Sequence, residues 1–415
     1  MGWVRTTAVV VAGAAVAGQA GAQSSRQQVT GPVATYWMSA STTSGFGAAM
    51  AGAQSGKRPS MGAMMGMMMG GGSNVGHSLS LQLGSSRRPM GDAKAEHLPP
   101  AGMGVGQSLP LLTPKAQPAQ RVDEAPAIPR EYQKPKGRML IFWGCGERAK
   151  AGQPVVIDFA QISEGRMPAG LEALTRGLNV TPMQPPSPGR NATYGEWPNE
   201  KTRTSVPATG SLVGDHLVRG SYTPEIRFAL SASQDFLPPL SFTAKDVTPT
   251  GSARLGWTPI QGASAYLATA IGAGQQDTVV LWTSSEVQAS AFSLPDYLST
   301  PDISRLVGAK ALLPAQARGC TIPQEVVKAA PQALVQLAAY GQEANFSYPP
   351  RPSNPKAPWN IDWSVKVRYK SQTAALLGVD MPGAGGRRGQ QQQPAQPPSV
   401  GGAILRGLGG KIPGL

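Results

Sequence analysis

Apolar and polar residues alternate one by one in several short segments of this chain, a pattern that belongs to extended strands. In IDWSVKVRYK the apolar side chains take every second position. These apolar residues, which should share one face of a strand, are Ile361, Trp363, Val365, Val367 and Tyr369. Because successive side chains of a strand point to opposite sides of a sheet, Lys366, Arg368 and Lys370 are expected to form a cationic stripe on the other face.

This stripe has two explanations. It could bind an anionic polymer, and the three cations are therefore candidate ligand-binding residues. It could also be a solvated face, since strands at the edge of a sheet often carry lysine, which prevents pairing with other chains. The second explanation is the more common one.

Other short strands are expected between frequent turn residues, because the chain holds 51 glycines and 39 prolines. In SLSLQL, Leu79, Leu81 and Leu83 alternate with polar residues, as in a half-buried strand. Further expected strands lie at 138–144, 154–159 and 224–231. Many short strands with few helices indicate a mainly β fold of sandwich type, and residues 73–243 are assigned to a first β-rich domain.

Three more strands are expected at 252–257, 265–271 and 278–282. The order of Trp257, then Gly262 and Ala263, then Tyr266 resembles the early strands of fibronectin type III and related immunoglobulin-like sandwiches. The resemblance covers residues 247–287 and implies a second β-sandwich domain, here bounded at 244–381. Within it, residues 322–341 are expected to begin with a short helix, and the rest of this segment is either a second helix or a strand.

The segments outside these domains have low-complexity composition. Residues 23–72 are rich in Gly, Ser, Ala and Met, residues 382–415 are rich in Gly, Gln and Pro, and both are expected to be disordered. The first segment contains a methionine tract that includes Met64, Met65, Met67, Met68 and Met69. Thioethers suit Cu(I), so this tract is a candidate copper site, although a flexible linker is the favoured explanation.

Residues 1–22 have the pattern of a secretory signal peptide. Arg5 precedes an apolar run that is too short to span a bilayer, and small residues lead to an expected cut before Gln23. No later stretch has the length of a transmembrane helix. The chain is therefore expected in the periplasm or outside the cell. Its net charge of +14 favours anionic partners such as acidic polysaccharides, although the cations are scattered.

Two cysteines, Cys145 and Cys320, lie 175 residues apart along the sequence. In an oxidising compartment they can form a disulfide, but sequence alone does not show whether they approach closely enough. Two buried thiols are the alternative.

Motifs of known chemistry give little support for an enzyme. Gly144, Gly146 and Ala149 imitate a dinucleotide fingerprint, but strand residues resume too soon for the helix that it requires, and no cofactor is expected. The three histidines suit neither a catalytic triad nor zinc. Tyr194, Glu196 and Trp197 form a cluster that could stack on a sugar and bind it. Glu196 and Asp235 are the carboxylates to consider for glycoside hydrolysis.

The segments KPKGRMLIFWGCGERAKAGQPVVIDF and TYGEWPN resemble uncharacterised exported proteins from Gram-negative bacteria. This resemblance implies a compartment and no chemistry. The sequence is thus compatible with three functional hypotheses: a non-enzymatic envelope protein that binds a polymer or a protein, a carbohydrate-active hydrolase or its accessory domain, and a methionine-rich copper-binding protein.

Overall fold

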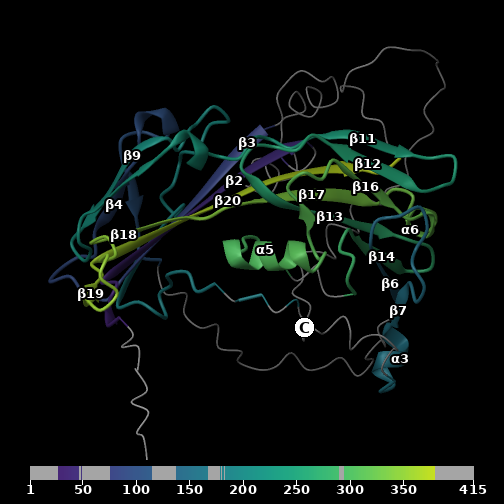
Figure 1. Cartoon of the computed structure of the whole chain (residues 1–415), viewed down its shortest axis with the longest axis horizontal. Helices are drawn as coiled ribbons and strands as arrows, with labels where there is room; N and C mark the ends of the chain where they lie inside the picture. The colour runs from purple at the N-terminus through teal and green to yellow at the C-terminus, as the bar shows by residue number, and fades with distance from the viewer. Residues whose placement is uncertain are drawn as a thin grey trace, which may run out of the picture.

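The computed structural model describes residues 27–45, 48, 75–114, 137–166, 178, 180–181, 183–288 and 294–378. These residues form a mainly β structure built from four sheets (Figure 1). The expected signal peptide, the methionine tract and the segment 382–415 lie outside the described residues.

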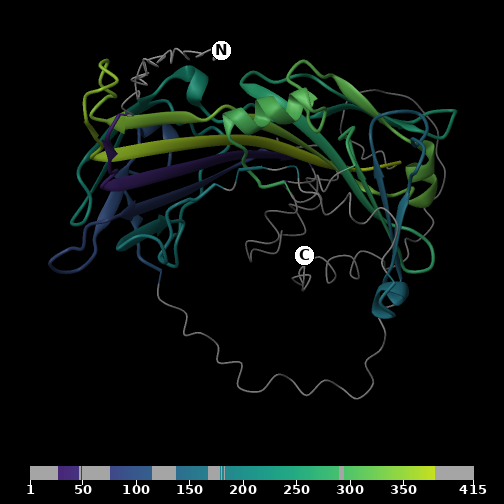
Figure 2. The same cartoon turned by 60° about the horizontal axis from the view of Figure 1, so that its bottom comes forward.

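The largest sheet, which we call the long sheet, runs through the whole molecule. In spatial order its strands are β7 (Val155–Asp158), β6 (Arg138–Trp143), β14 (Thr278–Thr283), β13 (Ala263–Ala273), β17 (Leu334–Gly341), β20 (Trp363–Leu376), β2 (Ala34–Gly45), β3 (Val75–Ser85) and β8 (Thr193–Trp197). Two further strands pair beside this path, β15 (Leu313–Pro314) with β13 and β18 (Ala344–Tyr348) with β20. The pairs β2–β20 and β6–β14 are parallel, and the other pairs are antiparallel. Figure 2 shows the sheet bent into an arch.

Two small sheets pack on the same face of the long sheet, one at the left and the other at the right in Figure 1. One contains β10 (Ile226–Leu230), β9 (Gly214–Gly220), β4 (Ala95–Leu98) and β5 (Leu109–Leu111), and the other contains β11 (Phe242–Val247), β12 (Ala253–Trp257) and β16 (Gly319–Ile322). The four-stranded sheet covers β2, β3 and β20, where Tyr36, Leu81 and Val367 are buried. The three-stranded sheet covers β13, β14 and β17 around Trp257 and Tyr266. Burial of these apolar faces against each other is the main stabilising contribution.

The remaining elements are short. They are α3 (Phe159–Ser163), α5 (Thr300–Gly308), α6 (Gln324–Ala329), two 3₁₀ turns (Ala101–Met103 and Ala232–Gln234) and a ribbon of β1 (Val29–Thr30) with β19 (Trp359–Asn360). α5 buries Ile303 and Leu306 against Leu267 and Tyr340, on the face of the long sheet opposite to the small sheets. No helix among the described residues combines the length and the apolar character needed to cross a membrane.

The strands found by alternation are confirmed. Leu79, Leu81 and Leu83 are buried while Ser78 is exposed, and β20 buries Val365 and Val367 but not the residues between them. Residues 138–158 form a strand, a turn with no helix, and a second strand, as expected from the glycines. For residues 322–341 the structure gives a helix, α6, followed by a strand, β17.

Two expectations need correction. The composition of residues 23–72 predicts disorder, but Ala34–Gly45 form a strand at the centre of the long sheet. An edge strand is the commoner explanation of the cationic stripe, but β20 is flanked by β2 on one side and by β17 and β18 on the other. In both cases the strand lies inside the sheet and buries one apolar face. A central position also gives each strand a hydrogen-bonding partner on both sides.

The expectation of two separate sandwiches at 73–243 and 244–381 is not confirmed. Strands from both segments, and β2 from outside them, belong to the same long sheet. In the structure, two small sheets instead pack on the same long sheet.

Cys145 and Cys320 form a disulfide, with their Cα atoms 5.4 Å apart. Cys145 follows β6 in the long sheet, and Cys320 lies in β16 of the three-stranded sheet. The bond therefore joins two layers of the structure.

Candidate functional site

The face of the long sheet opposite to the small sheets carries most of its polar side chains, and we call it the polar face. It is a consequence of the alternation along each strand. Since β2 buries Tyr36 and Met38, it turns Trp37 and Ser39 to the polar face, and β3 likewise presents Ser78 and Ser80. On β20 the same face carries Lys366, Arg368 and Lys370.

Strand register brings these residues together in rows. Ser80 lies opposite Ser39, and Ser39 lies opposite Arg368. In the neighbouring row, Glu196 pairs with Gln82 of β3, which pairs with Trp37. The two candidate clusters of the sequence, one on β8 and one on β20, therefore share the polar face with only β3 and β2 between them.

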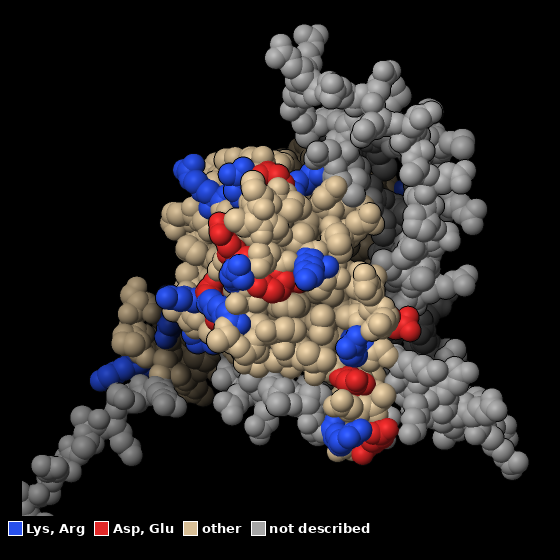
Figure 3. Space-filling view, turned by 90° about the vertical axis from the view of Figure 1, so that its right-hand side faces the viewer, with Lys and Arg blue, Asp and Glu red and all other residues tan. Residues whose placement is uncertain are grey.

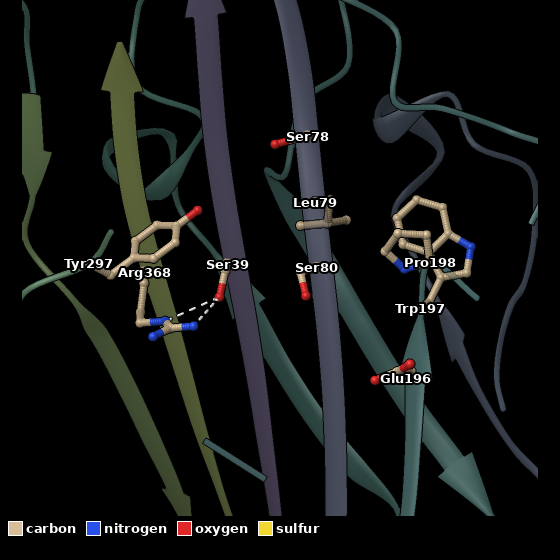
Figure 4. Close-up of a pocket in the computed structure, with 9 residues that line it drawn as sticks. All are labelled: Ser39, Ser78, Leu79, Ser80, Glu196, Trp197, Pro198, Tyr297 and Arg368. Atoms are coloured by element: carbon tan, nitrogen blue, oxygen red, sulfur yellow. Dashed lines mark hydrogen bonds between the residues drawn. The ribbon is translucent and has the colours of Figure 1, made fainter. Parts of the chain in front are cut away.

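An open groove of about 480 Å³ crosses this part of the polar face (Figure 4). Its lining residues come from β2, β3, β8 and β20 and from the loop before α5; they are Ser39, Ser78, Leu79, Ser80, Glu196, Trp197, Pro198, Tyr297 and Arg368. From β8 to β20 there are three strand spacings of about 4.8 Å, so the groove is about 14 Å across the strands. Figure 4 shows Glu196 and Arg368 on opposite sides of the serines.

The β8 side of the groove is held by hydrogen bonds between side chains. Tyr194 donates its hydroxyl to Glu196 Oε2 at 2.6 Å, and Gln82 Nε2 donates to the Tyr194 hydroxyl at 3.2 Å. Burial and the bond to Glu196 raise the pKa of Tyr194 far above its usual value, so the tyrosine stays a donor. Tyr194 therefore orients the Glu196 carboxylate. Trp197 points to the other face and is 4% exposed, which leaves little of its ring for stacking on a ligand.

The β20 side holds three cations, two of which have carboxylate partners. Lys366 Nζ lies 2.8 Å from Glu343 Oε2, and Lys370 Nζ lies 2.6 Å from Asp296 Oδ1. These pairs neutralise the two lysines, so the expected stripe of three free cations is reduced to the third member, Arg368.

The environment of Arg368 is different. Its guanidinium lies close to two aromatic rings, 4.7 Å from the centroid of Trp37 and 4.6 Å from that of Tyr297. Nε and Nη2 donate to Ser39 Oγ at 3.1 and 2.5 Å, and Nη1 lies 3.5 Å from Met183 Sδ. Burial lowers the pKa of Arg368, while Tyr297 opposes this effect, yet a guanidinium keeps its proton in proteins. No carboxylate among the described residues forms an ion pair with it.

One face of the molecule carries charges of both signs. On the face shown in Figure 3, lysine and arginine side chains alternate with acidic ones and do not gather into a patch of one sign.

Asp235, the second candidate carboxylate for hydrolysis, lies elsewhere. It accepts hydrogen bonds from the Ser211 hydroxyl and from the backbone of Leu212 and Phe236, at 2.6 to 2.7 Å, and it does not line the groove. It therefore holds a loop of the four-stranded sheet region in place.

Side chains that commonly bind metals do not gather in the part of the chain that the structure describes. These residues contain no group of three or more His, Cys, Asp or Glu side chains that could hold a metal ion. The five methionines of the candidate copper tract lie outside the described residues, so their prediction stays open.

Sequence reasoning missed the residues that surround Arg368. Trp37 and Ser39 lie in the segment expected to be disordered, although Tyr36, Met38 and Ala40 alternate there with more polar residues. That alternation could have identified the strand. Tyr297 and Met183 come from loops, and no local signal in the sequence connects either of them with Arg368.

Comparison of the chain with protein-family models, with curated proteins and with solved structures gave no match.

Proposed function

We propose that this chain is a non-enzymatic, exported cell-envelope protein that binds a polymer in the groove of its polar face. The observation that carries the proposal is the groove itself, which is open along a sheet and lined by serine hydroxyls between a carboxylate and an un-neutralised guanidinium. An open groove lined by hydroxyl groups suits a chain that extends beyond it, whereas small-molecule sites are more enclosed.

Export is supported by two features. The N-terminal sequence has the pattern of a secretory signal, and Cys145 and Cys320 are paired. Disulfides persist in the periplasm and outside the cell and are rare in the cytosol.

Binding is favoured over hydrolysis by the carboxylates. Glycoside hydrolases place two carboxyl groups on either side of the scissile bond. Among the described residues that line the groove, Glu196 is the single carboxylate, and Asp235 serves a different part of the fold.

The test is affinity electrophoresis of the purified protein, recovered after export, in native gels that contain acidic polysaccharides. Retardation by at least one polymer is expected. Ser78 is exposed on β3 and lines the groove, so Ser78→Trp should fill the groove and remove the retardation.

Ala229→Trp is the matched control, because Ala229 is also a small exposed residue of a strand but lies on β10, away from the groove. Equal retardation of the Ser78 variant and the wild-type protein would contradict the proposal.

A further inference from the structure

Arg368 has hydrogen-bonding capacity that the described protein does not use. A guanidinium has five N–H donors. Two of them donate to Ser39 and one faces the Met183 sulfur, a weak acceptor, so two remain without an acceptor among the described residues. Because Arg368 lines an open groove, these two donors face water in the free protein, and the oxygens of an anion can replace that water.

The position of Arg368 is fixed before any ligand arrives. The rings of Trp37 and Tyr297 both lie against the guanidinium, and Ser39 fixes one of its edges. Figure 4 shows Tyr297 and Ser39 beside it. Holding a side chain in this way lowers the entropy cost of binding. A planar guanidinium with two free donors matches the two oxygens of a carboxylate.

The charges around Arg368 also select an anion. The carboxylates of Glu343 and Asp296 interact electrostatically with Arg368, but each is paired with its own lysine. The three cations and two anions of this region leave one positive charge, which lies at the groove. A single free charge and two free donors fit one carboxylate better than a phosphate diester chain, which would need a series of cations.

The rest of the groove suits hydroxyl groups. Ser78 and Ser80 carry hydroxyls that both donate and accept, whereas the Ser39 oxygen already accepts twice from Arg368 and keeps only its O–H to donate. Glu196 can accept from a further hydroxyl because Tyr194 occupies only one of its oxygens. The distance of about 14 Å between the outer strands leaves room for more than one sugar ring.

We propose that the groove binds a polysaccharide made of carboxylated sugars, with one carboxylate on Arg368 and neighbouring sugar hydroxyls on the serines and Glu196. This inference rests on the proposed binding function and specifies its ligand class.

The experiment changes the ligand first and the protein second. Calorimetric titration of the wild-type protein uses polygalacturonate and alginate, the same polygalacturonate after reduction of its carboxyl groups to alcohols, and dextran sulfate. A carboxylated polymer should bind, and reduction of its carboxyl groups should weaken binding about ten- to a hundredfold, the worth of a hydrogen-bonded charge pair. Dextran sulfate should bind more weakly than the carboxylated polymer.

Arg368→Gln should reproduce the loss seen with the reduced polymer. Arg368→Lys keeps the charge but loses the planar pair of donors, so it should retain only part of the affinity. Arg254→Gln removes an arginine that pairs with Asp246 on the three-stranded sheet, and it should bind like the wild-type protein. The ligand comparison needs no variant, so it stands even where an Arg368 variant fails to fold.

The outcomes separate the two proposals. If the native and the reduced polymer bind equally and Ser78→Trp abolishes both, the groove binds a polymer but the carboxylate inference is wrong. If dextran sulfate binds best and Arg254→Gln weakens it as much as Arg368→Gln does, binding is general electrostatics and the inference is also wrong. If no polymer binds, the proposed function fails as well.

Discussion

Two of the three histidines lie in a buried chain of hydrogen bonds that starts at Tyr36. The Tyr36 hydroxyl lies 2.6 Å from His97 Nδ1, His97 Nε2 lies 2.9 Å from His216 Nδ1, and His216 Nε2 lies 2.7 Å from the Leu212 carbonyl. The carbonyl can only accept, so His216 must donate from Nε2 and accept at Nδ1. His97 then donates from Nε2, and Tyr36 donates to its Nδ1. One set of tautomers with both rings neutral satisfies every atom of the chain.

Because this buried chain of hydrogen bonds needs neutral histidines, we expect the protein to lose stability in weak acid. Burial lowers the pKa of His97, helped by His216, and burial also lowers the pKa of His216. The folded rings therefore stay neutral as the pH falls below their ordinary value of about 6.5, while the unfolded rings take up protons. The free energy of unfolding should be fully retained above pH 6.5. It should fall by up to about 1.4 kcal/mol per histidine for each pH unit below that value.

Urea unfolding at a series of pH values between 7.5 and 5 measures this slope. His216→Gln should flatten it. His77→Gln is the comparison: His77 lies outside the buried hydrogen-bond chain and is less buried, and although burial also lowers its pKa, this variant should flatten the slope less than His216→Gln. A slope that is unchanged in the His216 variant would rule out this explanation. Buried carboxylates with lowered pKa values, such as Asp302, change the free energy of unfolding only at lower pH. They therefore do not affect the slope between pH 7.5 and 5.

At the scale of elements, helix α5 ends in a backbone conformation that its sequence does not favour. The amide of Ala311 donates to the Leu306 carbonyl at 2.9 Å and that of Lys310 to the Val307 carbonyl at 3.0 Å, the two bonds of a Schellman motif. The motif places Lys310 at a φ of 59°, where glycine is the usual residue.

Lys310→Gly should therefore raise the free energy of unfolding by about 1 kcal/mol, since glycine adopts this conformation without strain. Thermal unfolding measures the effect. Lys310→Ala also removes the charge but keeps a Cβ, so it should give no such gain. Equal gains in the two variants would assign the effect to charge.

Which strands the sequence predicts depends on the size of their buried residues. In β3 and β20 the buried positions are leucine, valine, tryptophan or tyrosine, and the alternation is plain. In β2 the last buried residues are Ala40, Thr42 and Ser44, and the strand lies in a Gly, Ala and Ser-rich segment. Thr42 and Ser44 are satisfied by the carbonyls of Leu237 and Leu240, partners that local sequence does not reveal.

At the scale of the whole molecule, the disulfide joins the long sheet to the three-stranded sheet. It closes a loop of 175 residues, and restriction of the unfolded chain by such a loop contributes up to about 5 kcal/mol. The double variant Cys145→Ser/Cys320→Ser should therefore unfold at markedly lower urea concentration. Wild-type protein that is reduced in denaturant and refolded with its thiols blocked should behave in the same way. Two free thiols in the untreated, exported protein would contradict the pairing.

The candidate site also depends on the whole molecule, because it combines strands that are far apart in the sequence. The sequence marks both Glu196 and Arg368 as candidates, but their proximity arises from the spatial order β8, β3, β2, β20, which differs from the order along the chain. Short-range patterns identify strands and their faces. They do not identify neighbours that are brought together by long connections, so the groove and the lysine ion pairs could not be predicted.

The parallel pairing of β2 with β20 at the centre of the long sheet also delays assembly of the sheet during synthesis. Ala34 pairs with Trp363 and every later partner keeps this separation, which is 329 residues. At a synthesis rate of about 5 to 20 residues per second, β20 emerges about 15 to 65 s after β2. During this delay β2 has an open side, and an exposed strand edge is a site of aggregation. The nascent chain therefore has to be kept from self-association for tens of seconds, and assembly of the middle of the sheet is a late, slow event.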